Sequence, residues 1–205
     1  MTRGVLQLPS PMGLSAGAPV SGVHLGTGQR GQVTLRLFRG RPTRVAVVGA
    51  TAAAVLLAVR AAAAGASVVV SSERGAAWSS ALAHAVDARV VEQRSAPSAA
   101  GGPTLLVDDR PGEARGLGEA GAWQCRVDLR SPGTRADLAS LTAADVVLLG
   151  HIPAELADYV PALFVVPPAQ LTSLGGGTVA LVRRGSLEHV SLDPSASEAG
   201  LLFGS

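Results

Sequence analysis

The turn Gly49-Ala50-Thr51-Ala52-Ala53-Ala54 joins a run of valines to an alanine-rich segment, at a place where phosphate could bind. A loop that holds the pyrophosphate of a dinucleotide follows G-x-G-x-x-G/A, because glycines let the backbone approach the phosphates at the start of a helix. Gly49 supplies the first glycine and Ala54 the last small residue, whereas Thr51 replaces the second glycine. The Thr51 hydroxyl can donate a hydrogen bond, but its Cβ crowds the phosphate. The turn is therefore either a partial dinucleotide loop or an ordinary strand-to-helix turn with Thr51 as the N-cap.

Polar residues follow the next run of valines, where a dinucleotide site contacts the ribose. Ser71 and Ser72 end this run, and Arg74 lies two residues further on. An acidic residue at this place favours NAD, whereas arginine suits the 2′-phosphate of NADP. The candidate cofactor-binding residues are therefore Gly49, Thr51, Ala54, Ser71, Ser72 and Arg74, with NADP as the cofactor. The alternative is that the three polar residues belong to a surface loop and that the chain binds no cofactor.

Hydrolysis of a nucleoside triphosphate needs a residue type that the chain lacks. The phosphate loop G-x-x-x-x-G-K-[ST] requires a lysine, and all 17 basic residues here are arginine. Residues 104–109, TLLVDD, are similar to the strand whose terminal aspartate holds Mg²⁺ in such enzymes. Because the lysine is absent, we interpret Asp108 and Asp109 as two carboxylates at a strand end that hold no metal.

The remaining reactive side chains form no catalytic pattern. Cys125 is the single cysteine and alternates with polar residues in an expected strand, which favours a small buried residue over a nucleophile. No metal-binding spacing connects the four histidines. We therefore expect no catalytic residue and no metal site; the histidines are His24, His84, His151 and His189. The chain has only six aromatic residues, so an extended surface for stacking nucleic-acid bases is not expected.

The charges are unevenly distributed along the chain. Residues 1–72 contain seven arginines and no acidic residue, whereas the other 133 residues carry a net charge of −5 from 10 arginines and 15 acidic residues. Arg36, Arg39, Arg41 and Arg44 form the densest group, and guanidinium groups bind carboxylates and phosphates well. These four arginines are the candidate partner-binding residues, for an acidic protein surface or anionic head groups. The alternatives are a solvated edge, or neutralisation by Glu73 and the acidic C-terminal part.

Valine- and leucine-rich runs alternate with helix-forming segments. Short strand candidates occur near the N-terminus as VLQL and GVHL, and further strands are expected at 31–38, 45–48, 67–72, 89–92, 104–109, 123–129 and 145–151. Expected helices cover 51–64, 76–86, 135–143 and 153–160, and Gly65 is the expected C′ residue of the first. Residues 110–121 form either a loop or a poor helix. Residues 178–193 predict a hairpin around Gly185-Ser186.

This alternation predicts one doubly wound α/β domain, a Rossmann-like three-layer fold with a mostly parallel sheet and β additions at both ends. Within 1–205, residues 1–40 would form a β-rich extension, 43–193 the core and 194–205 a tail. Residues 45–70 are apolar enough to resemble a membrane span, but their valines cluster at both ends, which predicts strand, helix and strand. Prolines interrupt any apolar signal region near the N-terminus, so we expect a cytoplasmic protein with at most peripheral membrane contact.

The order of these features resembles two families. Residues 43–75 look like the first βαβ unit of NAD(P)-binding Rossmann proteins. The order over 43–193 also looks like the FtsK-like ATPase modules of actinobacterial type VII (ESX) secretion. In that resemblance VVGATAAAVLL stands for the nucleotide loop, TLLVDD for the Walker B strand and LGGGTVALVRRGSLEHVSLD for the closing hairpin. The missing lysine and second glycine imply a degenerate copy that does not hydrolyse nucleotides.

Two functional hypotheses follow from the sequence. The favoured hypothesis is a non-catalytic accessory or scaffold protein of a bacterial, type VII-like protein secretion system, which binds protein partners. The bias towards Ala, Arg, Gly and Val, without Lys or Asn, fits an actinobacterium of high GC content. The alternative is an NADP-binding oxidoreductase or a nucleotide sensor, which would use the six candidate cofactor residues.

Overall fold

A computed structural model describes most of the chain. The described residues are 22–92, 102–111, 120–130, 141–150, 159–167, 174 and 177–203. The VLQL run, residues 135–140 of the helix expected at 135–143, His151 and the expected helical residues 153–158 lie outside this part.

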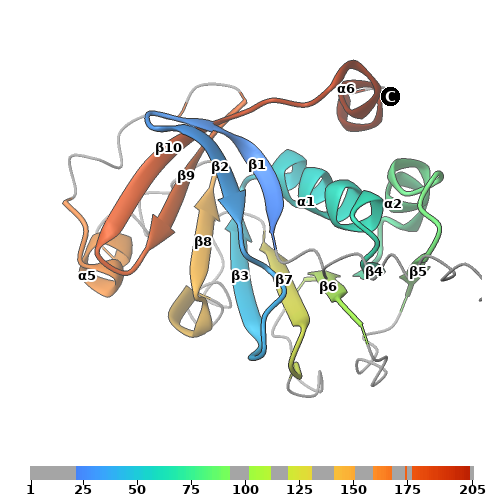
Figure 1. Ribbon diagram of the computed structural model, residues 1–205, viewed down its shortest axis with the longest axis horizontal. Coiled ribbons are helices and arrows are strands. Elements are labelled where there is room, and N and C mark those ends of the chain that lie inside the picture. The colour runs from blue at the N-terminus through green and yellow to red at the C-terminus, as the bar shows by residue number, and fades with distance from the viewer. Residues whose placement is uncertain are drawn as a thin grey trace, which may run out of the picture.

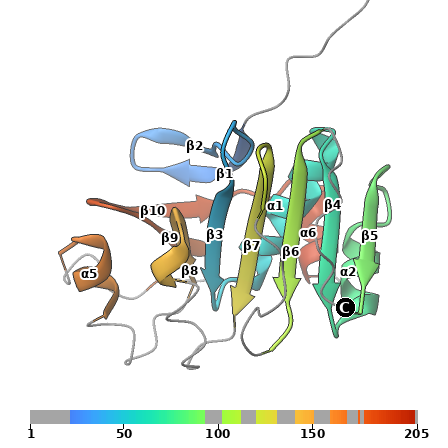
Figure 2. The same cartoon turned by 90° about the horizontal axis from the view of Figure 1, so that it is seen from below.

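All the described strands belong to one ten-stranded sheet with the order β2-β1-β10-β9-β8-β3-β7-β6-β4-β5. The strand bounds are Val23–Gly28 (β1), Gly31–Leu35 (β2), Thr43–Val48 (β3), Ser67–Ser72 (β4), Ala88–Val91 (β5), Thr104–Asp109 (β6), Gln124–Arg130 (β7), Val146–Leu149 (β8), Thr178–Arg183 (β9) and Ser186–Leu192 (β10). From β8 to β5 every pair of neighbours is parallel. Figure 2 shows the arrowheads of β3, β7, β6, β4 and β5 pointing to the same edge. We call this the carboxyl edge.

Antiparallel strands extend the sheet beyond β8. The hairpin β9–β10 pairs with β8, and the hairpin β1–β2 pairs with β10. The hairpin nearest the N-terminus and the hairpin nearest the C-terminus of the described residues therefore lie side by side in one antiparallel section (Figure 1). This arrangement confirms the expected α/β class with a parallel core and β additions from both ends.

Helices α1, α2 and α6 lie together on one face of the parallel strands (Figure 2). Their bounds are Thr51–Ala63, Gly75–Ala81 and Ala196–Phe203, and α5 at Tyr159–Phe164 belongs to the other face. Alternation along the strands separates two cores. Val45 and Val47 of β3 face α1, whereas Ala46 and Val48 face the core that contains α5.

Several of the strands, turns and helices expected from the sequence agree with the structure. Strands β4 and β6 have the expected bounds, and Gly65 adopts φ +86° directly after the turn that ends α1. Residues 45–70 form a strand, a helix and a strand, as expected. None of the helices in the described ranges has the length and apolar character that crossing a membrane requires.

Two helical segments differ from the expectation. The helix expected at 76–86 ends at Ala81, and the chain continues in i→i+3 turns at Ala83 and Ala85. The Asp87 carbonyl accepts from the Val68 amide, so this segment bends back towards β4. At the C-terminus, residues 196–203 of the expected tail form helix α6.

Candidate functional site

The turn between β3 and α1 is very short. Only Gly49 and Ala50 separate Val48, the last residue of β3, from Thr51, the first residue of α1. Gly49 has φ +62°, a conformation that suits glycine, and its amide donates to the Arg130 carbonyl at 3.1 Å. The first amide of the turn is thus bound by β7 and does not point to a ligand.

The helix start also differs from the expected cap. Ala50 is the N-cap residue of α1, and no side chain caps the helix, so the interpretation of Thr51 as the N-cap is wrong. Thr51 is the exposed first residue of the helix, because the tight turn leaves one residue fewer before the helical conformation begins. Ala54 is fully buried in the core, and its amide donates to the Ala50 carbonyl at 3.3 Å.

Gly150 closes the turn from the side of β8. Its amide donates to the Val48 carbonyl at 3.0 Å. A Cβ on Gly150 would lie 2.5 Å from the Gly49 carbonyl oxygen and 2.9 Å from the Ala50 Cβ. This close backbone approach leaves no room for the turn to widen into a loop that surrounds a phosphate.

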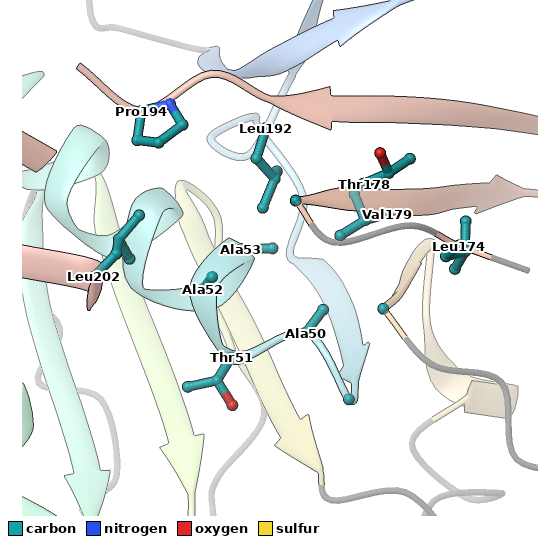
Figure 3. A pocket seen from close by; sticks show the side chains of 13 residues that line it. Ala50, Thr51, Ala52, Ala53, Leu174, Thr178, Val179, Leu192, Pro194 and Leu202 are labelled. Carbon is teal, nitrogen blue, oxygen red and sulfur yellow. The ribbon is translucent and has the colours of Figure 1, made fainter. Parts of the chain in front are cut away.

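A cavity of about 410 Å³ opens beside this turn (Figure 3). Its walls come from the turn, the start of α1, the start of β9, the end of β10 and α6. Ala50, Val179, Leu192, Pro194 and Leu202 give it an apolar lining, and the polar side chains are the hydroxyls of Thr51 and Thr178. None of the described lining residues is charged, so the cavity offers no counter-charge for a triphosphate.

The polar residues after β4 form a separate cluster around Asp109. Ser72 Oγ and Trp78 Nε1 donate to the Asp109 carboxylate at 2.7 and 2.6 Å. Arg74 donates to both carboxylate oxygens, at 3.1 and 2.7 Å. Ser71 and Ser72 are buried. The structure thus brings Ser72 and Arg74 together, but it neutralises the charge of Arg74 internally.

This cluster is far from the turn at Gly49. Strands β7 and β6 lie between β3 and β4, so three strand spacings, roughly 14 Å, separate the two places along the sheet. In the dinucleotide-binding strand order the first two strands of the fold are neighbours. The six candidate cofactor residues therefore do not converge on one site.

A buried charge network occupies the other face of β6 and β7. Arg130 Nη2 lies 3.0 Å from Oδ2 of Asp108, and the two side chains are only 3% and 2% exposed. Arg126 Nε donates to Asp128 at 2.7 Å, and Arg130 lies 3.7 Å from the same carboxylate. The network thus contains two arginines and two aspartates and is neutral overall.

Both aspartates of TLLVDD are therefore engaged by arginines. Asp108 pairs with Arg130, and Asp109 pairs with Arg74. Among the described residues, no three His, Cys, Asp or Glu side chains gather as a metal site would require. Sequence reasoning missed Arg126, Asp128 and Arg130, although their alternation with Cys125, Val127 and Leu129 indicated a charged row along one face of β7.

Cys125 belongs to the apolar face of the same strand. It is fully buried, and burial raises the pKa of its thiol far above the ordinary value. The thiolate that a nucleophile requires is therefore strongly disfavoured.

The four candidate partner-binding arginines lie at or near the amino edge of the sheet, opposite the carboxyl edge. Arg36 and Arg41 are exposed, whereas Arg39 and Arg44 are half-buried. Arg39 and Arg41 share one carboxylate, Asp145, at 3.0 and 3.5 Å. The expected internal neutralisation is thus partial and comes from Asp145, because Glu73 pairs with Arg110 instead.

A further ion-pair cluster attaches the C-terminal segment to α1. Arg60 donates to Glu198 through Nε at 2.8 Å and Nη2 at 2.9 Å, and it also contacts Asp193, which pairs with His24. Hydrogen bonds from Arg60 lower the pKa of Glu198 to about 2, and the same contact raises the pKa of Arg60. Partial burial opposes ionisation of Asp193, but hydrogen bonds from His24 and Arg60 outweigh it and lower its pKa.

Several solved structures have a similar fold. The cytoplasmic domain of EssC matches with a TM-score of 0.55 and 14% identity over 88% of this chain and 44% of that chain. EssC (ATPases 2 and 3) from Geobacillus thermodenitrificans matches with a TM-score of 0.54 and 11% identity over 84% and 41%. The pCW3 conjugation coupling protein TcpA, as a monomer with ATPγS, matches with a TM-score of 0.54 and 8% identity over 84% and 65%.

The chain shares the α/β fold of these three structures. It spans less than two thirds of each of these three proteins. No family model matches the sequence, and no curated protein matches it.

Proposed function

We propose that this protein is a non-catalytic binding module of a type VII-like bacterial secretion system, built on a P-loop ATPase fold whose nucleotide site is degenerate. The likeness to EssC supports the link to secretion, and that to TcpA extends it to conjugation machinery. The module acts in the cytoplasm through protein partners and needs no cofactor.

The main observation in support of this proposal is the two-residue turn, Gly49 and Ala50, between β3 and α1. A phosphate loop surrounds the β-phosphate with several backbone amides, and a lysine neutralises the charge. Here the Gly49 amide is bound to Arg130, Gly150 packs against the turn, and the neighbouring cavity is apolar. Asp108 is bound to Arg130 and is not available to Mg²⁺ or its water shell.

The test of this proposal is hydrolysis of ATP and GTP by the purified protein with Mg²⁺. We expect rates equal to the background without protein, and an Asp108→Asn variant that is equally inactive. Circular dichroism establishes whether the variant is folded. Hydrolysis well above background that is lost in a folded Asp108→Asn variant would overturn the proposal.

The NADP hypothesis retains one supporting observation. Gly49 turns sharply at φ +62°, as the first glycine of a dinucleotide loop does. The strand order and the pairing of Arg74 with Asp109 weigh against it. Thermal-shift titration with NADPH and NADH separates the two hypotheses: the binding module shows no shift at millimolar ligand, whereas an NADP protein is stabilised by NADPH more than by NADH.

A further inference from the structure

Trp123 combines a strained backbone with an exposed side chain. Its φ is +61°, a conformation that is rare for a bulky residue, and 37% of the residue is exposed to solvent. Two backbone hydrogen bonds hold this conformation. The Trp123 amide donates to the Arg39 carbonyl at 2.7 Å, and the Trp123 carbonyl accepts from the Thr104 amide at 3.0 Å.

Glycine would satisfy the same backbone geometry without strain, and Trp123 belongs to neither hydrophobic core of the described residues. Strained residues persist where the surrounding structure holds them, and they gather at binding sites. Strain and exposure together therefore indicate that the indole serves a contact outside the chain.

Arg39 contacts this tryptophan through the backbone, and Arg41 follows two residues later in the chain. The Arg39 guanidinium is fixed by Thr43 at 2.8 Å and by Asp145 at 3.0 Å. Arg41 reaches the same carboxylate at 3.5 Å, while 68% of its side chain remains exposed. The Asp145 carboxylate also accepts the Arg44 amide at 3.0 Å. One carboxylate thus serves two guanidinium groups, which leaves an excess of positive charge on the segment whose Arg39 carbonyl binds Trp123.

We propose that Arg39, Arg41 and Trp123 form a docking surface for an acidic segment of a partner protein that also carries an aromatic side chain. Arg41 pairs with a carboxylate of the segment, and Trp123 packs against its aromatic ring. This inference rests on the proposed role as a binding module, because it names the chemistry of the partner.

The surface favours a polypeptide over a lipid bilayer. Interfacial binding buries a broad apolar face among the lipids. At this edge the described residues include a single large exposed apolar side chain, Trp123. An acidic peptide is bound by separate cationic side chains, each of which pairs with one of its carboxylates.

The test uses a synthetic peptide of alternating glutamate and phenylalanine, with a glutamine-for-glutamate peptide as its control. The measurement is isothermal titration at low salt. We expect the glutamate peptide alone to bind. Arg41→Gln weakens its affinity about fivefold, whereas Arg184→Gln, the same charge change at an exposed site of the β9–β10 turn, leaves it unchanged.

Trp123→Gly separates a binding role from a structural role. We expect this variant to be at least as stable as the original chain, because glycine accepts the positive φ, while its affinity for the peptide falls about tenfold. Undiminished affinity of Trp123→Gly, or equal losses in Arg41→Gln and Arg184→Gln, would overturn the inference. Binding of vesicles that contain phosphatidylglycerol, without binding of the peptide, would overturn it in favour of a membrane. Nucleotide hydrolysis is measured separately, so a failure here leaves the proposed function standing.

Discussion

Arg130 and Asp108 form a buried ion pair at the carboxyl edge of the sheet, with 3.0 Å between Nη2 and Oδ2. Arg130 also donates from Nη1 to the carbonyls of Asp108, Arg110 and Leu129. Under the proposed function, β6 corresponds to the strand that carries the metal-binding aspartate in a working P-loop ATPase. A cationic side chain of the protein itself thus neutralises a carboxylate of the kind that such an enzyme reserves for Mg²⁺.

Removing one member of this pair should be costly. Arg130→Met leaves the Asp108 carboxylate buried without its partner, and we expect a loss of about 3–5 kcal/mol in the free energy of unfolding. Urea denaturation measures this loss. The matched control is Arg89→Gln, at an exposed position on β5, which should change stability by less than about 0.5 kcal/mol.

The double variant Asp108→Leu with Arg130→Met tests whether the loss comes from an unpaired charge. Because it removes both charges, we expect it to be more stable than Arg130→Met alone. If the double variant is as unstable as the sum of the single variants, the two side chains do not act as a pair.

Gly150→Ala should destabilise the turn at Gly49. The added Cβ would meet backbone atoms of Gly49 and Ala50 that cannot move independently of the sheet. We expect a loss of about 1–3 kcal/mol in thermal or urea unfolding. Gly40→Ala is the control, because a Cβ there meets no atom within 4 Å. Equal effects of the two substitutions would show that the turn is not tightly packed.

Glu198→Gln should reduce stability in a pH-dependent manner. The pKa of Glu198 is lowered from 4.5 to about 2 in the folded chain, chiefly by hydrogen bonds from Arg60. Its ionised form therefore stabilises the fold fully above about pH 4.5, and this contribution is lost as the pH falls towards 2. We expect the variant to be about 1–2 kcal/mol less stable at pH 7 and to approach the original chain near pH 2. A difference that does not change with pH would contradict this account of Arg60.

Local structure follows from the sequence where a single strand or turn determines it. The bounds of β4 and β6 follow from apolar runs between turn residues, and Gly65 ends α1 because glycine accepts positive φ readily. The hairpin β9–β10 follows from two alternating runs around Gly185. These features depend on neighbouring residues only.

The arrangement of the candidate site could not be derived in this way. The sequence places β3 and β4 in succession, but strand pairing inserts β7 and β6 between them and so separates Gly49 from Ser72 and Arg74. Arg130 is buried because Asp108 on a different strand compensates its charge, and no pattern within β7 alone records that contact. Helix α6 forms where Glu198 meets Arg60, which is 138 residues away.

Equilibrium binding of Mg-ATP, measured by isothermal titration calorimetry, tests the degenerate nucleotide site most directly. The turn has only two residues, the Gly49 amide is bound to Arg130, and the neighbouring cavity is apolar. We therefore predict no saturable binding up to about 1 mM ligand, a dissociation constant that corresponds to a binding free energy of about −4 kcal/mol. Saturable one-to-one binding well below that concentration would contradict the account.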